Sequence, residues 1–117
     1  RLAAEIVEAM ACAEQVRFVS SGTEADMYAM RLARAYRGRD KILKFEGGYH
    51  GMSDWGLMSL APQRPGNFPQ AVPDSAGIPR AVQNEMLVAP FNDAALAEAM
   101  VSSRLVSIPT PLKKATG

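Results

Sequence analysis

Residues 16–45 read VRFVSSGTEADMYAMRLARAYRGRDKILKF, and this stretch decides the fold. It opens with a short β-branched and aromatic segment, residues 16–20, and closes with a second, residues 41–45; both are typical of strands. Between them, apolar side chains recur at offsets 0, 3, 4, 7, 8 and 11 from Ala25, the pattern of one helix face. Strand, helix and strand in this order predict a βαβ unit with parallel strands and a right-handed crossover.

The central helix of this unit carries its own start and stop signals. Ser21 and Glu24 have the spacing of a capping box, and Gly38 follows the last apolar position. We expect the apolar stripe of the helix to pack against the sheet. The stripe consists of Ala25, Tyr28, Ala29, Leu32, Ala33 and Tyr36.

The remaining segments fit the same α/β class. Residues 46–80 are rich in glycine and proline and predict a long functional loop or lid, or a disordered linker, with one short helix at 55–60. The run Met86-Leu87-Val88-Ala89 predicts a strand buried on both faces. The other expected elements are helices at 2–13 and from Asn92 or Asp93 to Met100, and a strand at 105–108. Together they predict a mainly parallel sheet with helices.

Composition narrows the function classes. The 117 residues hold 13 basic and 12 acidic side chains, a net charge of +1 that argues against nucleic-acid binding. No apolar run approaches the ~20 residues that cross a bilayer, and no signal-peptide pattern is present. We therefore expect a cytoplasmic protein with no membrane partner. Since the chain starts at Arg1 rather than Met, we expect it to be a piece of a longer protein.

The Ser21-Gly22-Thr23 turn is the first candidate site. It lies between the predicted strand and helix, where free N–H groups and hydroxyls can bind an anion such as a phosphate. The alternative is that Ser21 and Glu24 only cap the helix. A dinucleotide site is disfavoured because one glycine stands where that fingerprint needs three, and no P-loop lysine follows.

The second candidate site is the turn that carries Tyr49 and His50 between glycines. It leaves the second predicted strand at its carboxyl end, so in a parallel pair it would stand beside the Ser21-Gly22-Thr23 turn. An aromatic ring beside a phosphate site suits a flat phosphorylated cofactor. The alternative is a packed tyrosine and a solvated histidine. Trp55, further along, is expected to anchor the loop.

Several ordered motifs resemble class III pyridoxal-phosphate-dependent aminotransferases. They are VRFVSSGTEA at 16–25, RLAR at 31–34, GRDK at 38–41, KFEGGYHG at 44–51 and APFND at 89–93. The resemblance covers residues 2–101 and is nearest to the glutamate-1-semialdehyde 2,1-aminomutase branch. It implies a partial cofactor-binding large domain of fold type I at 1–101, in a longer protein that is expected to be a homodimer.

The resemblance also implies roles for the two turns. Ser21, Gly22 and Thr23 would hold the phosphate of pyridoxal 5'-phosphate, Tyr49 would stack on its pyridine ring, and His50 would line the pocket wall. The loop at 46–80 would cover the site. The longer protein would transfer an amino group from a small-molecule amino donor to a carbonyl acceptor.

Other features depart from the family pattern. The Schiff-base lysine and the pyridine-binding aspartate of the family lie beyond Gly117, so we predict no catalytic residue and no metal site in this chain, and no turnover by the chain alone. Residues 102–117 match no family motif and predict an atypical tail, truncated or frameshifted; Lys113 and Lys114 lie in it. A non-catalytic phosphate-binding α/β module or an inactive remnant remain as alternatives.

Overall fold

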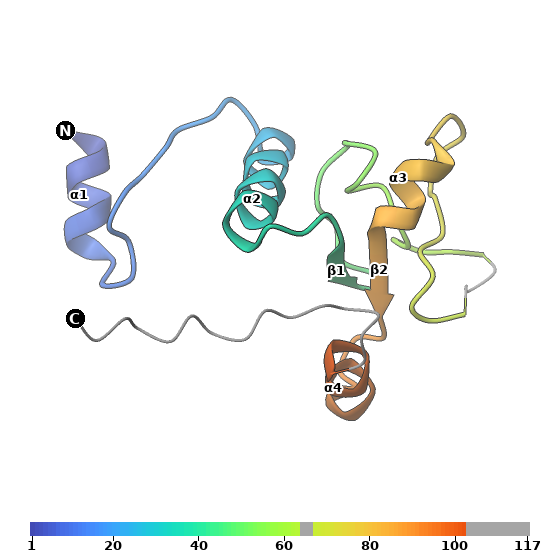
Figure 1. Cartoon of the computed structure of the whole chain (residues 1–117). Helices are drawn as coiled ribbons and strands as arrows, with labels where there is room; N and C mark the ends of the chain where they lie inside the picture. Colours follow the sequence, from blue (N-terminus) through green and yellow to red (C-terminus); the bar gives the residue numbers. More distant parts are fainter. Residues whose placement is uncertain (64–66, 103–117) are drawn as a thin grey trace.

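The computed structural model describes residues 1–63 and 67–102 (Figure 1). Its elements are, in chain order, α1 (Leu2–Ala9), α2 (Gly22–Arg37), β1 (Ile42–Phe45), α3 (Arg80–Glu85), β2 (Met86–Ala89) and α4 (Ala94–Ser102). The two strands form a parallel sheet in which Ile42 lies opposite Met86 and Phe45 lies opposite Ala89. The α/β class with parallel pairing is confirmed, and α3 is a helix that the sequence analysis did not predict.

Residues 16–20 do not form the predicted strand. No backbone hydrogen bond joins Val16, Arg17, Phe18 or Val19 to another residue in the part of the chain that the structure describes. The parallel partner of β1 is β2 instead, and the crossover between them is the loop after β1 followed by α3. A β-branched segment becomes a strand only when a neighbour bonds its N–H and C=O groups, and no described segment does so here.

Helix α2 has the predicted ends. The Ser21 hydroxyl accepts a hydrogen bond from the Glu24 N–H at 3.2 Å, and the Glu24 carboxylate accepts one from the Ser20 N–H at 2.9 Å. Gly38 ends the helix in the left-handed conformation, with φ +63°. This conformation favours glycine because it has no Cβ.

The predicted packing of α2 is wrong. The stripe expected against the sheet is open to solvent: Leu32 is 70% exposed and Tyr36 is 78% exposed. The helix instead turns Asp26 and Met30 toward β1, where both side chains line a cavity with Ile42. Of the stripe, Ala29 lines the same cavity and Tyr28 is half-buried beneath Arg17, whereas Leu32 and Tyr36 have no such cover from the described residues.

The core lies between the sheet and the segment that follows β1. Met58, Ala71, Met86 and Val88 are buried in it, and partly buried apolar side chains pack around them: Ile42, Trp55, Ile78 and Val82. Residues 55–60 are not the predicted helix, because Met58 forms an antiparallel bridge with Pro73. The Ser59 N–H donates to the Val72 carbonyl at 2.7 Å, and the Asp74 N–H donates to the Leu57 carbonyl at 3.0 Å. The loop after β1 is therefore a packed cover held by its own backbone pairing.

The first and last helices differ in their contact with this core. Helix α1 ends at Ala9, earlier than the predicted Ala13, and stands apart from α2 and the sheet in Figure 1. Helix α4 contacts β2 and buries Met100. Its first turn is capped by Asp93, whose carboxylate accepts from the Leu96 N–H at 3.0 Å. The predicted strand at 105–108 lies outside the described residues. None of the helices in the described ranges is long and apolar enough to cross a membrane.

Candidate functional site

The N-terminus of α2 presents two available donors. The N–H groups of Glu24 and Ala25 bond to the hydroxyl and the carbonyl of Ser21. The N–H groups of Gly22 and Thr23 have no acceptor among the residues that the structure describes. A Cβ built on Gly22 would meet nothing within 4 Å, so the space beside these donors is open. Two free N–H groups at the positive end of a 16-residue helix fit an anion.

The two predicted turns meet at Thr23 and Gly51. A Cβ on Gly51 would lie 2.6 Å from Thr23 Cα and 2.8 Å from Thr23 Oγ1, so only glycine allows this contact. Gly51 also has φ +82°, which other residues rarely adopt. The predicted closeness of the turns is confirmed. The turns are close because Gly51 packs directly on Thr23, and not because the strands before them pair in parallel.

This junction also orients the Thr23 hydroxyl. Thr23 Oγ1 accepts a hydrogen bond from the Met52 N–H at 3.1 Å. Because a hydroxyl has one donor and two acceptor sites, the O–H of Thr23 remains available for an external acceptor. Thr23 can therefore add a hydroxyl donor to the N–H groups of the helix end.

Tyr49 and His50 take different environments. Tyr49 is 62% exposed, so its ring offers a face to a ligand. His50 is half-buried, and its Nε2 would lie 3.0 Å from a Cβ on Gly48. Its backbone carbonyl would lie 2.4 Å from a Cβ on Gly56. Glycines thus make room for His50 on two sides, and its half-buried side chain differs from the fully solvated histidine of the alternative.

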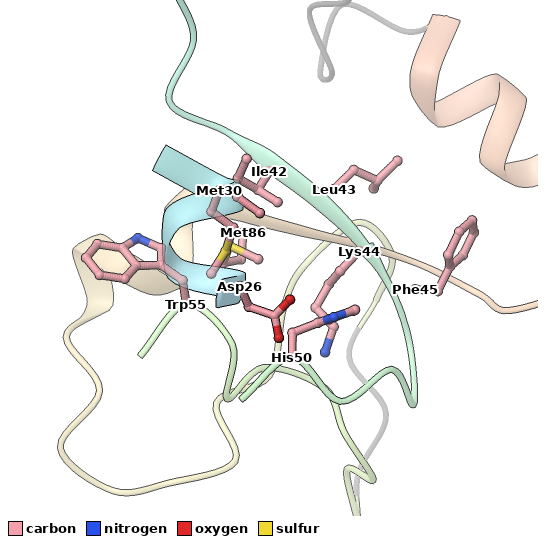
Figure 2. A pocket seen from close by; sticks show the side chains of 10 residues that line it. Asp26, Met30, Ile42, Leu43, Lys44, Phe45, His50, Trp55 and Met86 are labelled. Carbon is pink, nitrogen blue, oxygen red and sulfur yellow. The ribbon is translucent and has the colours of Figure 1, made fainter. Parts of the chain in front are cut away.

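His50 lines a cavity of about 270 Å³ between α2, β1 and the turn after β1 (Figure 2). Three polar side chains, Asp26, Lys44 and His50, gather at one end in Figure 2. The other end is apolar and includes Ile42 and Met86. Among the residues in the described ranges, no group of three His, Cys, Asp or Glu side chains is arranged to hold a metal ion.

Trp55 anchors the loop, as predicted. Its Nε1–H donates to the Glu85 carboxylate at 2.9 Å, and the Arg34 guanidinium carbon lies 5.4 Å from the centre of the ring. Arg34 also comes within 3.8 Å of Glu85 and donates to the Asp40 carbonyl at 2.7 Å. These contacts join α2, the loop and α3.

Lys44 also lines this cavity, although no sequence pattern predicted it as a site residue. Lys44 is only 6% exposed, and its burial lowers its pKa below the usual 10.5, an effect partly offset by the negative charge of Asp74. The available signal was a lysine between apolar neighbours in a four-residue strand, ILKF. In a strand with one solvated face, such a lysine would point into water. The alternation of the strand therefore predicts an exposed Lys44 and not the buried one that the structure shows.

Comparison with known proteins identifies the family. The profile of the family described as Aminotransferase class-III matches residues 1–113. This chain belongs to that family. The match continues past Val101, the residue at which the motif resemblance was expected to end.

Curated relatives agree with this assignment. The glutamate-1-semialdehyde 2,1-aminomutase of Methanothermobacter thermautotrophicus is 52% identical over 98 residues, which cover 83% of this chain and 22% of the relative. The enzyme of the same name from Francisella philomiragia is 54% identical over 92 residues, 79% of this chain and 21% of the relative. The chain thus spans about a fifth of the length of these relatives.

Solved structures support the fold-type-I class. An omega-transaminase from Sphaerobacter thermophilus superposes with a TM-score of 0.79 at 44% identity, covering 86% of this chain and 24% of that one. A transaminase with PLP bound superposes with a TM-score of 0.71 at 37% identity, covering 84% of this chain and 22% of that one. The described α/β unit is thus consistent with part of such a domain.

Proposed function

We propose that this chain supplies half of the cofactor site of a class III aminotransferase or aminomutase. Ser21, Gly22 and Thr23 bind the phosphate of pyridoxal 5'-phosphate, Tyr49 stacks on the ring, and His50 lines the pocket. The observation that carries the proposal is the packing of Gly51 on Thr23. Through this contact the N-terminus of α2, with its free N–H groups, meets the turn that carries the exposed Tyr49. The family is one of pyridoxal-phosphate enzymes, and one similar structure is a transaminase with PLP bound.

The residues present fit this cofactor. Its phosphate needs several donors, and the Gly22 N–H, the Thr23 N–H and the Thr23 O–H are available. Its flat ring needs an accessible aromatic face, which Tyr49 provides. When bound, the cofactor supplies an electron sink for amino-group transfer. The part of this chain is to bind and orient it.

The function of the longer protein follows from this role. It transfers an amino group between a small-molecule amino donor and a carbonyl acceptor, as a cytoplasmic homodimer with no nucleic-acid or membrane partner. Residues 1–101 form part of its cofactor-binding domain, with 46–80 as the cover. The two aminomutase relatives favour the aminomutase branch. The lysine and aspartate that complete the chemistry come from beyond Gly117, so this chain alone does not turn over.

The ring contact is tested by titrating the full chain with pyridoxamine 5'-phosphate. This form of the cofactor carries an amine in place of the aldehyde, so it cannot react with the lysines of the chain. We expect Tyr49→Ala to weaken binding by about three- to tenfold through loss of stacking. Tyr36→Ala is the matched control, because Tyr36 is equally a tyrosine open to solvent but lies at the far end of α2. Equal loss in both variants would contradict the stacking role.

The phosphate contact is tested with inorganic phosphate. Ser21→Ala removes the cap of α2 and Asp93→Ala removes the cap of α4, so each costs about 1 kcal/mol of stability. Only Ser21→Ala should weaken phosphate binding, measured by shifts of the Gly22 and Thr23 amide resonances. Failure of the wild-type chain to bind either phosphate or pyridoxamine 5'-phosphate would overturn the proposed function.

A further inference from the structure

Lys44 is a buried ammonium without a direct carboxylate partner among the described residues. Its Nζ donates to the Gly48 carbonyl at 2.8 Å and to the Met58 carbonyl. Asp74, whose negative charge partly offsets the desolvation of Lys44, uses its carboxylate to accept from the Leu60 N–H at 2.9 Å. A buried charge must be compensated, and here backbone carbonyl oxygens make the direct contacts. The interaction is therefore a link between the strand and two backbone segments.

The first of those segments is the turn of the proposed site, and the second is the loop that packs over the core. Gly48 directly precedes Tyr49, the proposed ring-stacking residue. Met58 lies in the buried segment that pairs with Pro73. Lys44 itself is held in register by β2, where it lies opposite Val88. One side chain thus fixes the turn relative to both the sheet and the cover.

The turn has few other restraints on the Gly48 carbonyl. Gly47 and Gly51 both have positive φ, and the three glycines of the turn contribute no side chain. The Gly47 N–H donates to the Ser59 carbonyl at 2.8 Å, and the Gly48 N–H donates to the Phe45 carbonyl at 3.2 Å. These bonds hold the amides that precede the Gly48–Tyr49 peptide. The Gly48 carbonyl belongs to the same rigid plane as the Tyr49 N–H, so holding it limits where the Tyr49 side chain can point.

We propose that Lys44 is a positioning residue, which orients the Tyr49 ring toward the cofactor by holding the Gly48–Tyr49 peptide plane. The inference rests on the proposed function of this turn. It distinguishes the two halves of the site: Lys44 acts on ring binding, whereas phosphate binding at Thr23 does not depend on the Gly48 carbonyl. A residue needed only for folding would affect both halves together.

The test compares two ligands of the full chain, pyridoxamine 5'-phosphate and inorganic phosphate. Lys44→Met keeps the length of the side chain and removes its donors. We expect it to reduce the preference for pyridoxamine 5'-phosphate over phosphate by about three- to tenfold, the size of a lost stacking contact, with the phosphate affinity nearly unchanged. Lys41→Met, the same substitution at an exposed lysine just before β1, should leave the preference unchanged.

Each outcome has a distinct meaning. If the wild-type chain shows no preference for pyridoxamine 5'-phosphate, the proposed function of the turn fails. If the wild type shows it and Lys44→Met retains it in full, the positioning role of Lys44 is overturned.

A second measurement uses only the wild-type chain and does not depend on whether Lys44→Met folds. The Lys44 ammonium resonance of the wild-type chain, assigned through its hydrogen-bond coupling to the Gly48 carbonyl carbon, should shift when pyridoxamine 5'-phosphate is added and stay in place when phosphate is added. Equal behaviour with both ligands, or no coupling to Gly48, would overturn the proposal even if Lys44→Met did not fold.

Discussion

The sheet and the helix that precedes it bury their apolar side chains to very different extents. All four residues of β2 are buried, whereas α2 has no buried residue along its 16 positions. Strand β2 is covered by β1 on one edge, by residues 69–70 on the other and by α4. Helix α2 is covered mainly on the face of Asp26 and Met30, and Arg17 lies over the ring of Tyr28 on another face.

The difference teaches that an apolar pattern and its burial are separate properties. The stripe of α2 has the spacing of a core-facing helix, and its Leu32 and Tyr36 end stays open because no described segment packs on it. The stability of the described unit should therefore depend on the sheet and its cover and not on this stripe. Trp55, the single tryptophan, packs against the core and reports its unfolding by fluorescence.

The largest expected effect comes from cutting one side chain in each region to alanine. Met58 is fully buried, so Met58→Ala should lower the free energy of unfolding by about 2–5 kcal/mol. Leu32→Ala on the exposed stripe should change it by no more than about 0.5 kcal/mol. Denaturant titration followed by Trp55 fluorescence measures both. A large loss from Leu32→Ala would show that the stripe is covered in solution and would remove the contrast between the two regions.

An intermediate effect is expected where the two regions touch. Gly51→Ala combines a strained φ with a Cβ 2.6 Å from Thr23 Cα, and should cost about 2–4 kcal/mol and weaken binding of pyridoxamine 5'-phosphate. Gly38→Ala is the control, since φ there is also positive but nothing lies within 4 Å of the added Cβ. It should cost about 1–2 kcal/mol and leave binding unchanged. Similar binding by both variants would mean that the Thr23–Gly51 contact does not shape the site.

The smallest effect concerns pH and Lys44. Because burial lowers the pKa of Lys44 in the folded chain, the unfolded chain binds more protons between that pKa and 10.5. The contribution of Lys44 to the free energy of unfolding should therefore rise as the pH increases toward 10.5. We expect the difference in stability between wild type and Lys44→Met to grow in favour of the wild type over this range. For the exposed Lys41→Met, the difference in stability from the wild type should not change with pH. If the difference for Lys44→Met stayed constant or fell as the pH rises, the desolvation of Lys44 would be contradicted.

Features that depend on a few neighbouring residues could be predicted from the sequence. The capping bonds of Ser21 and Glu24 and the left-handed Gly38 were among them, since their partners lie within four residues. The buried strand β2 was also predicted, because a continuous apolar run leaves no solvated face. The closeness of the two candidate turns was predicted as well, although through strands that the described residues do not pair.

Features that depend on distant partners were not predictable in the same way. Residues 16–20 have the composition of a strand, but a strand also needs a neighbour for its backbone groups. The segment at 55–60 has apolar residues suited to a helix, yet Met58 and Ser59 pair with residues 72–73 instead. The burial of Lys44 follows from the cover that folds over β1, and its position in the strand did not reveal it.

The sequence by itself determined the family motifs, the ends of α2, the apolar run of β2 and the residue types of the two turns. These follow from side-chain chemistry and from hydrogen bonds that close over a few residues. Only the tertiary structure decided that Gly51 touches Thr23, that Lys44 holds the Gly48 carbonyl and that the stripe of α2 is open. Contacts of this kind join residues far apart in the chain, so they depend on which surfaces meet when the whole unit packs.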